Sequence, residues 1–162
     1  IYVDATSMST QYLVFLTVDC QKNKNMQRKM DKAVATGDKD RIRFLTWLLS
    51  KSQAVRTVAI HRITMNEGRN TAGVDKVSMK GVKNKKDFKT KLLKQLNLMK
   101  KPTAIRRAYI PKPNGKKRPL GIPTMMDRII QGIIRMCIEP IAEYHYSDAS
   151  YGFRPNCLDS VR

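Results

Sequence analysis

The stretch "IRRAYIPKPNGKKRPLGIPTMMDR", Ile105 to Arg128, decides how this chain folds around its most unusual feature. Two strand-like segments, Ala104 to Pro111 and Lys117 to Ile122, flank a Pro-Asn-Gly turn at residues 113–115. Asn-Gly is a strong hairpin signal because both residues tolerate positive φ. The stretch therefore predicts a β-hairpin, and Pro119 in its second half indicates an exposed edge.

The end of the same stretch predicts the start of a helix. Thr124 can cap it, and Asp127 stands three residues later at the acid position of a capping box. Isoleucines then recur near helical period, which predicts a helix that belongs to the core. We expect Pro140 to kink or end this helix.

Six cations and no acid lie between Ile105 and Arg118, and the whole segment from Lys80 to Arg118 contains a single acid, Asp87. Like charges on a projecting ribbon repel one another unless an anion docks there. Phosphate is the natural candidate, because arginine offers a planar donor fork and lysine a compact charge. The lysines between Lys80 and Lys101 can equally form no more than a solvated helix face.

The composition supports a folded, basic protein. The chain has 162 residues, 32 Lys and Arg against 13 Asp and Glu, a net charge of +19 and 41% hydrophobic residues. Such an imbalance indicates a polyanionic partner, while the apolar content argues against a disordered tail. The three cysteines, Cys20, Cys137 and Cys157, form no metal-binding spacing and indicate free thiols in a reducing compartment. We expect a cytoplasmic or organellar-matrix protein that is not secreted and has no membrane partner.

Upstream of the hairpin, apolar periodicity predicts a mainly helical body. The predicted fold class is thus mainly α with one β-hairpin (α+β). The predicted helices cover Asp19 to Thr36, Lys39 to Met65 and Lys85 to Lys100, with a polar, glycine-containing loop between the last two.

The sequence contains none of the familiar catalytic motifs considered below. No Walker-type phosphate loop is present, and two histidines cannot support a Ser-His-Asp or Cys-His set. The acids are few and scattered, so we predict no catalytic residue and no metal ligand in this chain.

The segment "RRAYIPKPNGKKRPLGIPTMMDRIIQGIIRMCIEPIAE", followed by "SYGFRPN", resembles the fingers of group II intron-encoded reverse transcriptases, also called maturases. Upstream, "RNTAGVD" is similar to the family's N-terminal loop block, and "GDKDRIRFLTWLLSKSQAVRTVAIHRIT" to the helical extension of its chloroplast-like branch. The resemblance implies a helical extension at residues 20–68 and the fingers of a right-hand polymerase at residues 69–162. Residues 1–19 remain unassigned.

The resemblance also implies roles for particular residues. Arg106 and Lys112 match positions that bind the incoming nucleoside triphosphate. Template contacts are implied for Ile122, Pro123, Arg154 and Asn156. An RNA-binding surface is implied for Arg69, Asn70, Arg107, Lys116, Lys117, Arg118, Lys83, Lys85, Lys86, Lys100 and Lys101. Structural alternatives are that Arg106 pairs with Asp127 or Glu139, and that Ile122 fills the space under the hairpin.

The chain ends just after the "FRPN" block, and the palm's "YxDD"-type turn does not occur in it. We therefore expect a piece of a longer protein, with palm and thumb absent, that is inactive as a polymerase alone. Its last helix should then expose an apolar face. The complete enzyme is expected to need Mg²⁺, with intron RNA as partner and a DNA target as a further one.

Three alternatives compete with this interpretation. The first is a non-enzymatic splicing factor that binds RNA with a degenerate or absent palm. The second is a reverse transcriptase of a retron, diversity-generating or CRISPR-linked system, which the helical extension disfavours. The third is a generic basic RNA-binding domain.

Overall fold

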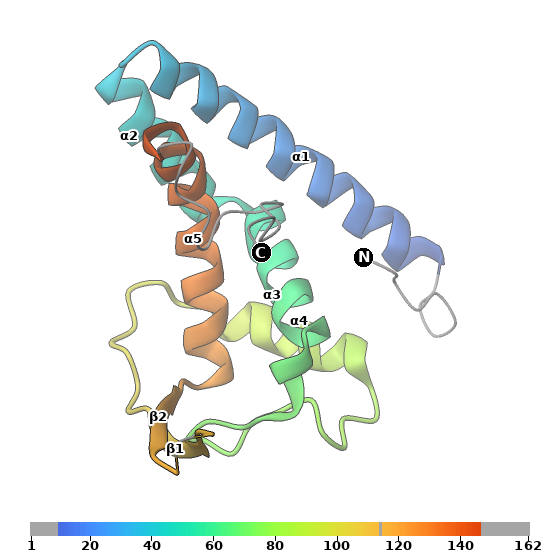
Figure 1. Cartoon of the computed structure of the whole chain (residues 1–162). Helices are drawn as coiled ribbons and strands as arrows, with labels where there is room; N and C mark the ends of the chain where they lie inside the picture. Colours follow the sequence, from blue (N-terminus) through green and yellow to red (C-terminus); the bar gives the residue numbers. More distant parts are fainter. Residues whose placement is uncertain (1–9, 114, 147–162) are drawn as a thin grey trace.

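The computed structural model of the chain describes residues 10–113 and 115–146 and is mainly helical with a two-stranded antiparallel hairpin (Figure 1). This confirms the predicted α+β class. In chain order the elements are α1 (Thr10–Ala35), α2 (Lys39–Lys51), α3 (Gln53–Met65), the 3₁₀ turn η2 (Glu67–Asn70), α4 (Lys85–Gln95), β1 (Arg106–Pro111), β2 (Lys117–Ile122) and α5 (Met125–His145).

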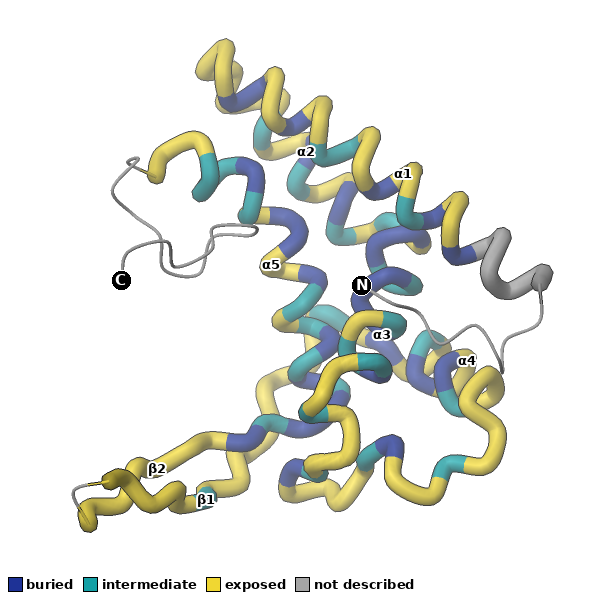
Figure 2. Tube along the Cα trace, turned by 45° about the vertical axis from the view of Figure 1, so that its right-hand side comes forward, coloured by how far each residue is buried: buried dark blue, intermediate teal, exposed yellow. Residues whose placement is uncertain are grey.

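The hydrophobic core lies where α1, α2, α3 and α5 meet, and α4 packs against α3. Met30 of α1, Leu49 of α2, Val55 of α3 and Ile129 of α5 are each fully buried there. Figure 2 shows buried segments concentrated in these helices, while the hairpin extends from the body almost wholly exposed. The helices therefore hold the fold together and the hairpin projects from it.

The predicted helix from Lys39 to Met65 is wrong as a single element, because Ser52 interrupts it with an extended backbone (φ −63°, ψ 126°). The core positions explain the break. Leu49 and Val55, both fully buried, stand six residues apart, a spacing that one straight helix does not keep on one face. Two shorter helices, each rotated to suit its own contacts, bury both residues.

Other helix limits also differ from the prediction. The first helix begins at Thr10 instead of Asp19, and α4 ends at Gln95, before the predicted end at Lys100, because Leu96 takes an extended conformation. The predicted domain boundary at residue 20 falls inside α1, and the one at residue 69 falls inside η2. Both boundaries stay predictions.

The start of α5 follows the sequence prediction. Thr124 caps the helix by accepting a hydrogen bond from the Asp127 amide at 3.2 Å, and its hydroxyl donates to the Asp127 carboxylate at 2.6 Å. All these groups are buried.

Of the two outcomes expected at Pro140, a kink or the end of the helix, the end is wrong, because α5 continues to His145. Pro140 has no N–H, so the carbonyl of Met136, four residues earlier, loses its usual donor. The side chain of Gln27 on α1 donates to this carbonyl at 3.3 Å and replaces the missing bond. The Gln27 side chain of the neighbouring helix α1 thus compensates for Pro140 inside α5.

As expected, α5 exposes apolar side chains to solvent. Ile134 is 51% and Ile138 49% exposed, one helical turn apart. The "SYGF" segment at residues 150–153, whose apolar side chains are also expected to lack a partner, lies outside the described residues. No described helix combines the length and the apolar character that a membrane span requires.

Candidate nucleic-acid interface

The predicted β-hairpin is present. β1 pairs with β2 so that Arg106 faces Ile122 and Pro111 faces Lys117. At the turn, Lys112 donates its amide to the carbonyl of Lys116 at 2.8 Å, and Gly115 takes a positive φ of 75°. The other turn residue of the predicted pair, Asn114, lies outside the described residues.

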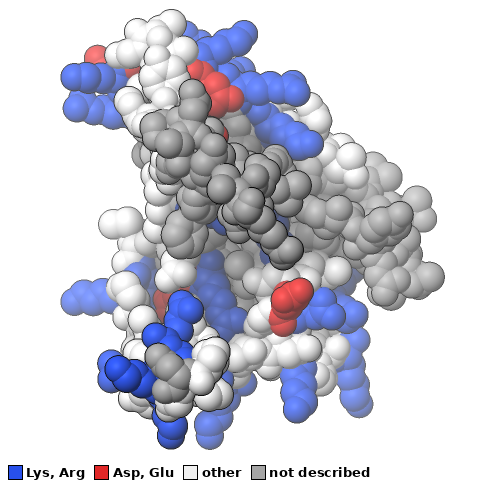
Figure 3. All heavy atoms as spheres, viewed as in Figure 1, with Lys and Arg blue, Asp and Glu red and all other residues white. Residues whose placement is uncertain are grey.

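Cations occupy both faces of this ribbon. Because side chains alternate along a strand, Arg106 and Arg107 lie on opposite faces. By the register, Arg118 stands opposite Ile110 and so shares the face of Arg106, whereas Lys117 shares that of Arg107. All four residues are exposed. Figure 3 shows Lys and Arg side chains gathered over the hairpin, with few acidic atoms near them.

Acidic groups that could neutralise Arg106 are bonded elsewhere. The Asp127 carboxylate accepts the Thr124 hydroxyl at 2.6 Å and the Thr103 amide at 3.3 Å. The Glu139 carboxylate pairs with Arg135 at 3.2 Å. Among the described residues, neither of the two acids considered as partners of Arg106 forms an ion pair with it.

Ile122 and Pro123 lie at the base of the hairpin. Ile122 is only 8% exposed and Pro123 is half-buried, so both sit where the ribbon joins the body. The structural alternative for Ile122, a residue that fills space under the hairpin, accounts for this burial. Its contact with a template stays a prediction.

Arg128, which sequence reasoning did not single out, ties the loop after α3 to the hairpin base. Its guanidinium donates to the carbonyls of Pro123 at 3.0 Å, Gly68 at 3.0 Å and Thr71 at 2.6 Å. The sequence feature that could have drawn attention to Arg128 is its position in "MMDR", directly after the capping residue Asp127 at the start of a helix. A fork of several donors on one planar group suits three converging carbonyls.

Gly73 brings the same loop close to α5. A Cβ at this position would lie 2.8 Å from the Thr124 Cα and 2.9 Å from its amide nitrogen, so only glycine fits. This close contact and the hydrogen bonds of Arg128 anchor the loop beside the base of the hairpin. Arg69 and Asn70 belong to this loop and are exposed. The structure thus brings two predicted RNA-binding segments together.

The lysines around α4 form a second cationic surface. Asn84 caps this helix by accepting hydrogen bonds from the amides of Lys86 and Asp87 at 3.1 and 3.3 Å. The predicted RNA-binding lysines here are all exposed, namely Lys83, Lys85, Lys86, Lys100 and Lys101.

Lys89 differs from the other lysines of α4. It is buried, with its Nζ atom 3.4 Å from Nδ1 of His61 on α3. Burial and the nearby Lys85 lower the pKa of Lys89. Burial and the charge of Lys89 lower the pKa of His61 to about 4. This pair joins two helices within the body and takes no part in the exposed surface.

Two predicted template residues, Arg154 and Asn156, lie outside the described residues. Within the described part, no group of three His, Cys, Asp or Glu side chains could hold a metal ion. Cys20 and Cys137 are free thiols, and burial raises the pKa of Cys137 to about 11. The described residues thus offer mainly cationic and apolar surfaces.

Comparisons with known proteins agree with this picture. The family model for the N-terminal domain of reverse transcriptase matches residues 18–96. Protein YkfC of Escherichia coli (strain K12) is 40% identical over 139 residues, which cover 80% of this chain and 34% of that protein. Group II intron-encoded protein LtrA of Lactococcus lactis subsp. cremoris is 53% identical over 55 residues, covering 33% of this chain and 9% of LtrA. A putative COX1/OXI3 intron 2 protein of Saccharomyces cerevisiae is 33% identical over 107 residues, covering 64% and 12% respectively.

The fold and these matches together define the class of protein: a helical, basic N-terminal domain of the reverse transcriptase type. The chain spans about a third of the length of YkfC and a smaller share of the other two relatives. The chain belongs to the group II intron-encoded reverse transcriptases and maturases, and it corresponds to their N-terminal region.

Proposed function

We propose that the chain forms the helical extension and fingers of a group II intron reverse transcriptase and maturase. In that role it binds the intron's own RNA, assists splicing, and presents nucleotide and template for RNA-directed DNA synthesis during retrohoming. The observation that carries the proposal is the projecting ribbon with exposed cations on both faces and a single acid between Lys80 and Arg118. An RNA partner in turn implies a cytoplasmic or organellar-matrix location.

One face of the ribbon suits a triphosphate. Arg106 opens β1 and Lys112 directly follows its last residue, Pro111, so about 20 Å of extended backbone separates their Cα atoms. Arg118, on the neighbouring strand, lies between them by register. These three side chains are long enough to converge on one triphosphate, and their fixed positive charges would stabilise the charge that develops on the pyrophosphate.

The template would pass the base of the ribbon. Ile122 and Pro123 offer an apolar surface that tolerates any base. Template contacts are also proposed for Arg154 and Asn156, which lie outside the described residues. A template contact for Ile122 requires the side chain to be uncovered in part, since it is only 8% exposed here.

RNA binding would rest on phosphates. The surface consists of the loop residues Arg69 and Asn70, the hairpin cations Arg107, Lys116, Lys117 and Arg118, and the exposed lysines around α4. Folded RNA is recognised largely through its backbone and shape, for which dispersed lysines and arginines suffice. A DNA target would meet the same charges.

Chemistry requires carboxylates that the described residues do not supply. The Mg²⁺ expected for the complete enzyme would act at those carboxylates by stabilising the attacking and leaving oxygens. This chain's residues would bind and orient the nucleotide only. If the complete protein carries a degenerate palm, the same surfaces instead serve a splicing factor without polymerase activity.

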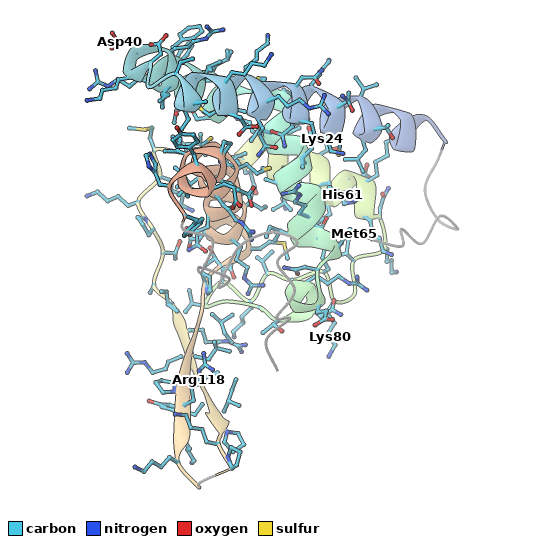
Figure 4. The ribbon with its side chains drawn as sticks, turned by 45° about the horizontal axis from the view of Figure 1, so that its top comes forward. Lys24, Asp40, His61, Met65, Lys80 and Arg118 are labelled. Atoms are coloured by element: carbon cyan, nitrogen blue, oxygen red, sulfur yellow. The ribbon has the colours of Figure 1, made fainter. Side chains whose placement is uncertain are left out.

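The test is a pair of charge removals in the complete protein. Lys112→Gln should raise the KM for deoxynucleoside triphosphate about tenfold while changing RNA affinity little, because one charge-assisted contact is lost. Lys24→Gln, on α1 at the far end of the molecule from Arg118 (Figure 4), is the matched control and should leave the KM unchanged.

RNA affinity, measured by filter binding from low to high salt, should fall steeply, with a slope of about 0.7 per neutralised phosphate. A flat salt response would overturn the RNA-binding proposal. Loss of RNA affinity by Lys112→Gln with an unchanged KM would favour a generic RNA-binding domain. Absence of any DNA synthesis by an intact, RNA-bound protein would favour the splicing factor.

A further inference from the structure

The face of the hairpin that carries Arg107 and Tyr109 contains an open cleft, and Arg107 alone among its lining residues has a predicted role. Its volume is about 460 Å³, and it is lined by Ile105, Arg107, Tyr109, Pro119, Leu120 and Gly121. Every one of these residues is exposed, including Tyr109 at 59% and Ile105 at 60%. An aromatic ring, an arginine and apolar side chains therefore share one solvent-facing hollow.

The strand register gives the hollow its shape. Tyr109 faces Pro119 across the two strands, and Arg107 faces Gly121. Because Gly121 has no side chain, the space opposite Arg107 stays open. A Cβ at residue 121 would lie 2.9 Å from Cγ2 of Ile105, so even alanine would intrude into this space. Gly121 thus contributes room beside the tyrosine ring.

The chemistry of the cleft matches a flat ring attached to a phosphate. The tyrosine face can stack on a planar heterocycle, and stacking of this kind accepts any base. Arg107 supplies a donor fork beside the ring, and Lys117, two residues from Pro119 on the same face, adds a second cation. A purely apolar ligand would leave both cations unused, whereas a nucleotide in an RNA strand engages every part of the cleft.

We propose that this cleft holds an unpaired nucleobase of a single-stranded RNA segment, stacked on Tyr109, with the adjoining phosphates on Arg107 and Lys117. The inference rests on the proposed RNA-binding function and adds a second, independent face to it. One side of the ribbon then serves the triphosphate, and the other grips an RNA strand through a base as well as through its backbone.

The experiment compares two RNA probes with the 162-residue chain. One is a short single-stranded oligoadenylate, and the other has the same sugar-phosphate backbone without bases. Tyr109→Ala should weaken binding of oligoadenylate about tenfold and leave the abasic strand unchanged, since a stacked base contributes on that order. Tyr109→Phe should restore the wild-type difference, because the phenyl ring still stacks. Gly121→Ala, which fills the cleft, should act like Tyr109→Ala.

Tyr144→Ala on α5 is the matched control, because this tyrosine is 57% exposed and far along the chain from the hairpin. It should leave both affinities unchanged. The Tyr109 effect should persist at high salt, where phosphate contacts weaken, because stacking does not depend on counterion release.

The outcomes distinguish a failure of base stacking in the cleft from a failure of RNA binding as a whole. If wild-type protein binds both probes equally and Tyr109→Ala changes neither, the base-stacking inference fails while RNA binding stands. An equal loss for both probes also overturns it, since a base contact cannot affect an abasic strand. If the wild-type chain binds neither probe, the RNA-binding function itself fails.

Discussion

The helical body and the hairpin use their residues in opposite ways. In the body, Met30, Leu49 and Ile129 are wholly buried, and most charges lie at the surface, with Asp19, Lys89 and Asp127 as buried exceptions. In the hairpin, Tyr109, Ile110 and the cations alike face solvent. An isolated two-stranded hairpin is at best marginally stable in water, so this one depends on its anchorage to the body. The comparison indicates that stability resides in the helices and binding in the ribbon.

The largest effect should come from the core. Ile129→Ala removes a fully buried side chain of α5 and should lower the free energy of unfolding by about 2–5 kcal/mol. Urea denaturation followed by circular dichroism measures this change. Ile134→Ala, on the exposed side of the same helix at 51% exposure, should change it far less. Equal losses would contradict the division between buried and exposed faces.

The next effect should come from the anchorage. Arg128→Met keeps the length of the side chain and removes its donors to the carbonyls of Pro123, Gly68 and Thr71. We expect a loss of roughly 1.5–3 kcal/mol, as for hydrogen bonds to charged groups, and faster hydrogen exchange in the loop at residues 66–73. Arg135→Met, which breaks an exposed ion pair with Glu139, is the control and should cost about 0–1 kcal/mol.

Gly73→Ala should have a somewhat smaller effect on the same anchorage. The added Cβ would press on the Thr124 backbone, which cannot move aside as a flexible side chain would. Overpacking of this kind costs about 1–3 kcal/mol. Thermal unfolding measures it, and Gly68→Ala, whose Cβ would meet Asn66 Oδ1 at 3.7 Å, serves as control. Similar melting temperatures for both variants would contradict a tight contact at residue 73.

The His61–Lys89 pair predicts a weaker, pH-dependent effect inside the body. His61 has a pKa of about 4 when folded, below the ordinary 6.5. As the pH falls through about 6.5, the unfolded chain takes up a proton that the folded chain resists until about pH 4. The free energy of unfolding should therefore decrease with falling pH across this window. His61→Gln should remove that part of the decrease, and a slope unchanged by the substitution would exclude His61 as its source.

The smallest effect on stability should come from the ribbon. Lys112→Gln and Arg118→Gln alter exposed side chains, so each should change the free energy of unfolding by less than about 0.5 kcal/mol. For Arg118→Gln, the salt slope of RNA binding should nevertheless fall by about 0.7. A large loss of stability from either substitution would mean that the ribbon supports the fold after all.

Much of the fold could be predicted from local patterns. The Asn-Gly signal predicted where the hairpin lies, and Thr124 with Asp127 predicted the start of α5, because turns and caps depend on neighbouring residues. The break at Ser52 was missed because apolar residues continue on both sides of it. The one sequence signal of two helices is the six-residue spacing of Leu49 and Val55, which does not keep both residues on one helix face. The cation-rich site was visible in composition alone, although its two faces follow from the pairing of the strands.

The sequence by itself determined the charge, the helical class, the hairpin and the family resemblance, since each depends on composition or on residues close together along the chain. Only the tertiary structure decided how Arg128 reaches the Gly68 carbonyl, 60 residues away, and how Gln27 supplies the bond that Pro140 denies to Met136. It also decided that Gly121 leaves room beside Tyr109. Such contacts depend on how distant segments pack, and no local propensity specifies that packing.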